Sequence, residues 1–237
     1  MNNSKVLVIS PTLNEEDNIE EHLMGLLASG YNVLIVDDNS QDNTPEIVKK
    51  NEYFDNSLFM IERIDKTGLG SAYIDGFNWG LKRNYDYLVE MDADLSHSIS
   101  DLNLMMSNVE GYDLIIGSRY IPNGSTIGWS TSRRLLSKYA NFLSKIILKS
   151  SVNDLTSGFR IYKSKNIKNT EFFNSPCEGY SFQVDMTVRA EDAKFMIKEV
   201  PISFKERKSG KSKMNKKIIL EAALYLFKSI FRSNHNN

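Results

Sequence analysis

The sequence predicts an α/β protein with a mostly parallel central sheet and helices on both faces of that sheet. The first observation is a set of short runs rich in branched apolar residues, at 5–10, 32–38, 58–63, 85–92 and 113–119. The second is a set of helical patterns between the first four runs, at about 18–30, 43–52 and 68–83. This alternation is typical of parallel sheets that are buried on both faces. The 237 residues are enough for one large domain with an ample core.

The composition excludes several classes of protein. The 29 basic and 30 acidic residues nearly balance, so we expect no nucleic acid partner. The single cysteine, Cys177, excludes an internal disulfide and suits a reducing compartment. The first residues lack the pattern of a signal peptide, and no apolar run reaches the roughly 18 residues of a spanning helix. We therefore expect the chain to be kept on the cytoplasmic side of a membrane.

Polar residues gather where three of the predicted strands end. The first strand is followed by "SPTLNEE" (10–16), the second by "DDNS" (37–40) and the fourth by "DADLSH" (92–97). Ligands of open α/β sheets bind beyond the carboxyl ends of the strands, and these ends meet at one edge. The sequence therefore predicts a binding site there.

Asp92 and Asp94 end the fourth apolar run with only Ala93 between them. Residues i and i+2 of a strand point the same way, so both carboxylates would project together from its end. Two like charges so close repel unless a cation or hydrogen-bond donors lie between them. Taken alone, such a pair is more often a solvated acidic turn.

Two common nucleotide-binding classes do not fit the sequence. No G-x-G-x-x-G follows the first strand, where a dinucleotide-binding domain needs its pyrophosphate loop. The G-x-G within "GLGSAYIDG" (68–76) lies in a later unit, and no P-loop is present. The sequence therefore disfavours dinucleotide oxidoreductases and ordinary ATP or GTP hydrolysis.

Nine motifs, in order along the chain, resemble those of the polyprenyl-phosphate sugar transferases, the dolichol-phosphate mannose synthase branch of the family 2 glycosyltransferases. They are "PTLNEEDNI" (11–19), "VDDNSQDNT" (36–44), "RIDKTGLGSAY" (63–73), "MDADLSH" (91–97), "GSRYI" (117–121), "GWSTSRRLLSKYAN" (128–141), "DLTSGFRIY" (154–162), "GYSFQVDM" (179–186) and "PISFKERKSGKSK" (201–213). The resemblance implies a GT-A type fold, a nucleotide-sugar donor, a divalent metal and a lipid-phosphate acceptor.

The resemblance also implies the donor side of the site. Asp92 and Asp94 would hold Mg²⁺ or Mn²⁺, which binds carboxylates together with substrate phosphates. Ser96 stands where some relatives carry a longer amide, so a third protein ligand stays open. The expected donor-binding residues are Pro11, Asn14, Glu15, Asp37, Lys66 and Asp92. For Asp38 and Asn39, a turn that closes the second strand is as plausible a function as ligand contact. Gly68 and Gly70 are explained equally well as turn glycines and as part of the site.

The acceptor side would consist of cationic side chains. A lipid phosphate is already ionised near neutral pH, so it needs no catalytic base, and arginine forks match its oxygens. The expected acceptor-binding residues are Arg119, Arg133, Ser137, Arg160, Arg207 and Lys213, of which Arg133 and Ser137 are four apart on a predicted helix. Asp94, Arg119, Arg133 and Arg207 are the expected catalytic residues.

Two segments have the pattern of helices that lie in a membrane interface. Residues 133–149 place Arg134, Lys138, Lys145 and Lys149 in one stripe and apolar residues on a broad opposite face. Residues 216–232 repeat this pattern, so we divide the chain into a catalytic domain, 1–213, and an amphipathic helix with tail, 214–237. The alternative is a pair of helices that pack on the core. The interfacial reading makes the protein peripheral to the cytoplasmic face of a membrane, held by lipid contact or by an anchoring partner.

The predicted activity is inverting transfer of a hexose onto dolichyl or another polyprenyl phosphate, with mannose from GDP-mannose favoured. One alternative is a related transferase that uses UDP-glucose or another sugar nucleotide. The other is an inactive GT-A scaffold subunit, which would not need to keep metal and phosphate ligands. The Q-x-x-R-W signature of processive polysaccharide synthases is absent, which argues against polymerisation.

Overall fold

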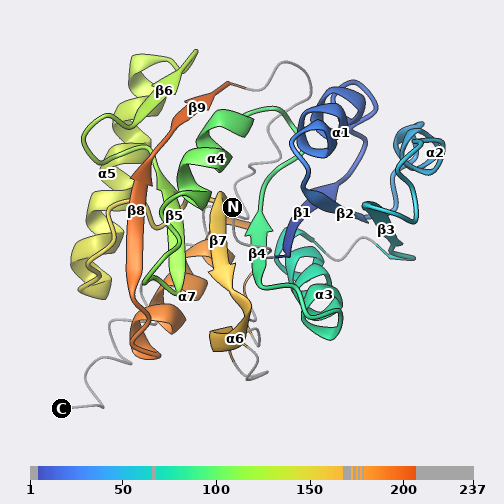
Figure 1. Cartoon of the computed structure of the whole chain (residues 1–237). Helices are drawn as coiled ribbons and strands as arrows, with labels where there is room; N and C mark the ends of the chain where they lie inside the picture. The colour runs from blue at the N-terminus through green and yellow to red at the C-terminus, as the bar shows by residue number, and fades with distance from the viewer. Residues whose placement is uncertain are drawn as a thin grey trace.

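The computed structural model describes residues 5–65, 68–167, 172, 175, 177 and 179–206. Its main feature is a seven-stranded sheet with the order β3-β2-β1-β4-β7-β5-β8 (Figure 1). Only β7 is antiparallel to its two neighbours, so the prediction of a mostly parallel sheet is confirmed. The strands are β1 (Val6–Thr12), β2 (Asn32–Asp37), β3 (Leu58–Glu62), β4 (Tyr87–Glu90), β5 (Leu114–Ser118), β7 (Arg160–Lys163) and β8 (Ile197–Pro201).

The three predicted helices and the helix predicted at 133–149 are all present, displaced at their ends by a few residues. The helices of the described chain are α1 (Ile19–Ala28), α2 (Thr44–Lys49), α3 (Leu69–Lys82), α4 (Ile99–Met106), α5 (Thr131–Leu148), α6 (Ser164–Ile167) and α7 (Gly179–Asp192). Two short strands, β6 (Ser125–Ile127) and β9 (Ser203–Lys205), pair in parallel as a second sheet. The residues assigned to the C-terminal segment, 214–237, lie outside the described residues.

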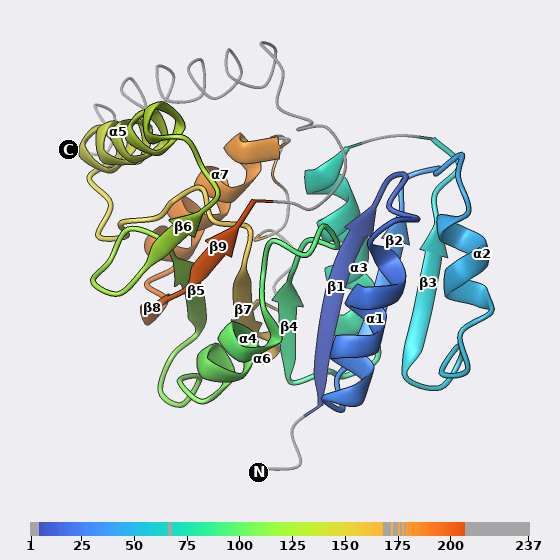
Figure 2. The same cartoon turned by 90° about the horizontal axis from the view of Figure 1, so that it is seen from above.

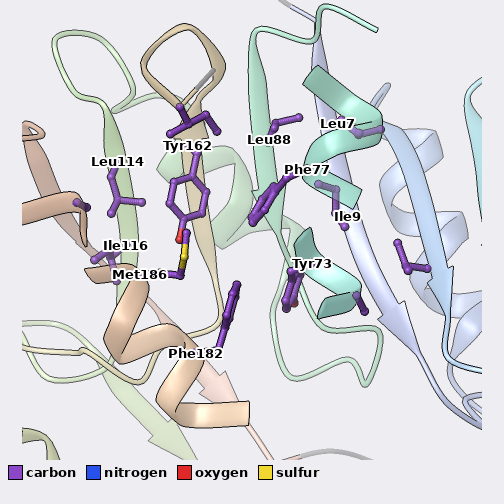
Figure 3. Close-up of a cluster of buried hydrophobic side chains, with 14 of the residues drawn as sticks. Leu7, Ile9, Tyr73, Phe77, Leu88, Leu114, Ile116, Tyr162, Phe182 and Met186 are labelled. Atoms are coloured by element: carbon purple, nitrogen blue, oxygen red, sulfur yellow. The ribbon is translucent and has the colours of Figure 1, made fainter. Parts of the chain in front are cut away.

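The central sheet is buried on both faces, as its continuous apolar strands predict. Leu7 and Ile9 of β1 belong to a core on the α3 and α7 side, where Phe77 and Phe182 pack (Figure 3). Val8, between them, faces the opposite core, to which α1 and α4 contribute. This alternation follows from the two-residue period of a strand, so one apolar run supplies both cores.

The fourth strand ends earlier than the sequence suggested. β4 stops at Glu90, two residues before the first acid of the pair, and Leu95 has a left-handed φ of 62°. Asp92 and Asp94 therefore lie in the loop after β4 rather than within the strand.

Beyond β5, the chain departs from simple β-α alternation, because β7 inserts antiparallel between β4 and β5.

The long helix α5 lies near the β8 end of the sheet, on the side where α7 lies (Figures 1 and 2). Its inward residues are polar, since Asn141 and Ser144 are buried. Most of its large apolar residues face outward, and those exposed by 40 % or more are Leu135, Leu136, Tyr139, Phe142, Leu143 and Ile146. The helix is therefore amphipathic, but most of its large apolar side chains face away from the core, unlike those of a core helix. Among the helices of the described residues, none has the length and apolar character to cross a membrane.

Candidate active site at the carboxyl ends of the strands

The loops after β1 and β2 are joined by hydrogen bonds. Asn14 has a left-handed φ of 55°, and its side-chain oxygen accepts a hydrogen bond from the backbone amide of Gln41 at 2.8 Å. The backbone amide of Asn14 donates to the Ser40 hydroxyl at 2.8 Å. The Glu15 amide donates to the Thr44 hydroxyl at 2.9 Å. These hydrogen bonds tie the two loops together, and the first loop carries two of the predicted donor-binding residues, Asn14 and Glu15. A third, Pro11, lies in β1.

Asp37 is at the end of β2 and is only 2 % exposed. Its carboxylate accepts from the Thr12 hydroxyl at 2.8 Å and from the Ser40 hydroxyl and amide at 2.6 and 2.9 Å. These bonds fix the carboxylate beside the first two loops. Its predicted contact with the donor nucleoside stays a prediction.

Arg63, to which the sequence analysis gave no role, organises the neighbouring loop. Its guanidinium pairs with Asp38 at 3.1 Å and donates to the Gly68 carbonyl at 3.1 Å and the Ser71 hydroxyl at 2.6 Å. Asp38 is therefore largely a structural partner, and Asn39, with φ 63°, donates to the Ile64 carbonyl. The only sequence signal for Arg63 was its place at the start of a quoted motif.

The two glycines of this region have structural functions. Gly68 has a φ of 101° at the start of α3, a conformation that side chains disfavour. A Cβ on Gly70 would lie 2.7 Å from the Cys177 carbonyl oxygen and 2.9 Å from the Phe182 ring. Gly70 therefore lets α3 approach α7 closely. Lys66, predicted to contact the diphosphate, lies outside the described residues.

The acid pair lies in a loop held by specific hydrogen bonds. Tyr73 of α3 donates its hydroxyl to Asp92 at 3.0 Å, and the Ser96 amide donates to Asp94 at 3.1 Å. Asp94 is 5 % exposed, whereas Asp92 is half-buried. Burial and the nearby carboxylates raise the pKa of Tyr73 well above its usual value, so its hydroxyl keeps the proton that it donates.

The donor atoms at the acid pair are of the kind that hard divalent cations prefer. Within the described residues, no group of three His, Cys, Asp or Glu side chains is arranged to hold a metal. Asp92 and Asp94 stay a predicted site for a divalent cation, and Mg²⁺ commonly completes its coordination with substrate phosphates and water. Among the residues that the structure describes, none forms a hydrogen bond with the buried Ser96 hydroxyl.

Arg160 corrects one prediction. Its side chain is fully buried, and its guanidinium donates to the carbonyls of Ser157 and Leu155 at 2.8 and 2.9 Å. It therefore does not present a surface to a lipid phosphate. Its charge instead lies near buried Glu90, whose pKa is raised to about 7 mainly by desolvation, and Arg160 opposes that rise.

Arg119 follows β5 and is 8 % exposed. Its guanidinium forms a bidentate pair with Asp154, at 2.8 and 2.7 Å, and also donates to the Thr156 hydroxyl at 2.8 Å. Thr156 in turn contacts Asn141 of α5 at 3.0 Å. This buried network anchors α5 to the end of the sheet. The predicted contact of Arg119 with the acceptor phosphate stays a prediction.

Arg133 and Ser137 lie one turn apart on α5, as predicted, and have different partners. Arg133 pairs with Glu206 at 2.7 Å, and its guanidinium lies 4.1 Å from the centre of the Trp129 ring. The Ser137 hydroxyl accepts from the Tyr120 hydroxyl at 2.6 Å. Arg207 and Lys213, the other predicted phosphate ligands, lie outside the described residues.

Aromatic rings connect the acid loop to the arginine region. The His97 ring packs on Phe159 at 4.4 Å and meets the edge of Phe204 at 5.2 Å between centroids. Phe204 also meets Trp129 at 5.4 Å. Burial holds the pKa of His97 well below its usual range, so the imidazole is neutral. The acid loop and the Arg133 region are therefore parts of one packed unit.

The sequence is similar to those of known glycosyltransferases. The sequence profile described as glycosyl transferase family 2 matches residues 7–170. An undecaprenyl-phosphate mannosyltransferase of Micrococcus luteus is 41 % identical over 223 residues, which span 93 % of this chain and 91 % of the relative. A polyprenol monophosphomannose synthase of Mycolicibacterium smegmatis is 40 % identical over 223 residues, which span 92 % of this chain and 84 % of the relative.

Solved structures show the same fold. The glucosyl-3-phosphoglycerate synthase of Mycobacterium tuberculosis, in complex with Mn²⁺, UDP-glucose and phosphoglyceric acid, superposes with a TM-score of 0.72. It is 14 % identical, and the match covers 97 % of this chain and 80 % of that one. The fold and the loop site together define a glycosyltransferase with a GT-A type fold. The chain belongs to glycosyl transferase family 2.

Proposed function

We propose that this protein transfers mannose from GDP-mannose to the phosphate of a polyprenyl lipid. The observation that carries the proposal is the identity of about 40 % to two bacterial polyprenyl-phosphate mannose transferases, over more than nine tenths of this chain. The structure supports it, because an acid pair suited to the donor diphosphate and an arginine region suited to a phosphate belong to one packed unit.

The reaction would be a direct displacement. An oxygen of the lipid phosphate attacks the anomeric carbon of mannose, the bond from that carbon to the diphosphate breaks, and GDP leaves with its electron pair. Asp92 and Asp94 would hold a divalent cation, which stabilises the charge on the leaving diphosphate when it is bound. Attack from the face opposite to the leaving group inverts the anomeric centre.

The residues of this chain would act mainly by positioning and by charge. The lipid phosphate is ionised at neutral pH, so no residue needs to remove a proton. Arg133 would bind the attacking phosphate, with Ser137 on the same face of α5 as a second donor. Tyr73 fixes Asp92, and the Arg119–Asp154 pair fixes the start of the segment that leads to α5.

The exposed face of α5 would contact the membrane that contains the acceptor. Between Thr131 and Lys149 the sequence has five basic residues and no acidic residue, which suits anionic head groups. The buried polar side of the helix leaves its apolar side outward. Arg133 is in the first turn, so this orientation would place the phosphate-binding end near the lipid surface. Lys145 departs from the predicted basic stripe, because it bonds to Ser151 and Asn153. We place the protein peripherally on the cytoplasmic face.

Donor choice is tested by the shift in melting temperature on addition of a sugar nucleotide with Mn²⁺. A ligand that binds only the folded state stabilises it in proportion to its affinity. GDP-mannose should give a larger shift than UDP-glucose or UDP-GlcNAc at equal concentration. A larger shift with UDP-glucose would favour a glucosyltransferase, and no shift with any donor would favour a scaffold.

A further inference from the structure

Glu206 is an anionic partner of Arg133. Its carboxylate lies 2.7 Å from a terminal nitrogen of Arg133, the residue that we assign to the phosphate. The Arg133 guanidinium is at the same time stacked over Trp129. The Trp129 ring therefore covers one face of the guanidinium, and the Glu206 carboxylate pairs with one of its edges.

The backbone positions Glu206 independently of this ion pair. The Glu206 amide donates to the Ile127 carbonyl at 2.9 Å, which extends the β6–β9 pairing by one residue. Gly128 has a φ of 86°, and a Cβ there would lie 2.9 Å from the Glu206 Cβ. The fold therefore keeps space for Glu206 beside Arg133.

The Arg133–Glu206 pair is more exposed than the Arg119–Asp154 pair. The side chains of Arg119 and Asp154 are 6 % and 0 % exposed, whereas those of Arg133 and Glu206 are 35 % and 47 % exposed. Breaking a buried pair is costly, but an exposed pair contributes little to stability. The Arg133–Glu206 pair can therefore open at little cost when a stronger anion arrives.

We propose that Glu206 is an exchangeable counter-ion that holds Arg133 in place until the acceptor phosphate displaces it. This inference rests on the proposed function only for the identity of the anion. A phosphate monoester carries up to two negative charges near neutral pH, whereas the mannosyl phosphodiester product carries one. Glu206 therefore competes better against the product than against the acceptor, which favours release of the product.

The test compares E206Q with the native protein in binding inorganic phosphate, with Mg²⁺ and GDP at saturating concentration to fill the donor site. Gln keeps the shape of the side chain and removes the competing charge. We expect E206Q to bind phosphate about three- to tenfold more tightly, a range that allows for solvent screening. E206D, which keeps the charge, should stay closer to the native protein. E46Q, which removes the charge from the exposed Glu46–Lys50 pair of α2, is the matched control and should change nothing.

A second readout uses transfer to a short, water-soluble prenyl phosphate. E206Q should lower its KM and strengthen inhibition by the mannosyl phosphodiester product. Phosphate binding that is unchanged or weaker in E206Q, or undetectable in both proteins, would overturn the counter-ion role. Tighter phosphate binding by E206Q in a protein that transfers no mannose would leave the counter-ion role intact and contradict the proposed function.

Discussion

The backbone amide of Lys205 donates a 3.0 Å hydrogen bond to the carbonyl oxygen of Ser96. This bond joins β9, which leads to Glu206, to the loop that holds Asp92 and Asp94. The His97–Phe204 contact reinforces the same connection. The proposed donor side and the proposed acceptor side are therefore joined through the backbone, although they come from distant parts of the sequence. In-line displacement needs such a fixed geometry between the two substrates.

Asp94→Asn should reduce transfer by about a hundredfold or more, because it removes a charge from the proposed cation site. It should also weaken metal-dependent nucleotide binding, measured by titration calorimetry with and without Mn²⁺. The melting temperature of the free protein should change little, since the side chain keeps its shape. Full activity of this variant after EDTA treatment would remove Asp94 from the metal site.

Arg133→Ala should raise the KM for polyprenyl phosphate about ten- to a hundredfold, and the KM for GDP-mannose much less. Hydrogen bonds to charged groups contribute about 1.5–3 kcal/mol, which gives this range. Arg83→Ala is the control, because Arg83 also stacks on a tryptophan, Trp79, at 3.7 Å. Steady-state kinetics with each substrate varied in turn make the comparison. An equal effect on both KM values would place Arg133 outside the acceptor site.

Replacement of Leu136 and Phe142 together by Asp should release the protein from anionic liposomes in a sedimentation assay. These side chains are 68 % and 60 % exposed, so we expect the variant to fold normally. Met24→Asp is the matched control, because Met24 is a 66 % exposed apolar residue of α1. Activity on a short, soluble prenyl phosphate should survive. Undiminished liposome binding would show that α5 is not the contact surface.

Glu90→Gln should flatten the dependence of stability on pH between about 4.5 and 7. Burial raises the pKa of Glu90 from 4.5 to about 7, so the folded state holds this proton more tightly than the unfolded chain. The corresponding stabilisation is complete below pH 4.5 and is lost as the pH rises to 7. The variant should therefore gain stability relative to the native protein above pH 7, on the order of 3 kcal/mol. Urea unfolding at pH 5 and pH 8 measures the difference, and an identical pH dependence in both proteins would contradict it.

The sequence predicted the elements whose signals are local. Apolar periodicity placed the first five strands and the first three helices, because burial repeats every two or 3.6 residues. It also located the acid pair, since both residues directly follow a buried run. Pairings between distant residues carry no such signal. Arg133 and Glu206 are 73 positions apart, and the antiparallel insertion of β7 depends on strands that are far from it in the sequence.

Burial of single charged residues was equally hard to predict. Arg160 lies within a motif and has the residue type of a phosphate ligand, yet its guanidinium donates hydrogen bonds to backbone carbonyls inside the protein. Arg63 has the same residue type and organises the donor-side loop through Asp38. Only the three-dimensional positions of their partners distinguish these roles, because an arginine is a surface charge, a structural clamp or a ligand according to its surroundings.

The most direct test of the proposed function is transfer by the purified protein from labelled GDP-mannose to polyprenyl phosphate in liposomes with Mn²⁺. We expect a labelled lipid that forms only when both the metal and the lipid phosphate are present, and that does not form with Asp94→Asn. A labelled lipid from UDP-glucose but not from GDP-mannose, or no lipid-linked sugar from any donor, would contradict it.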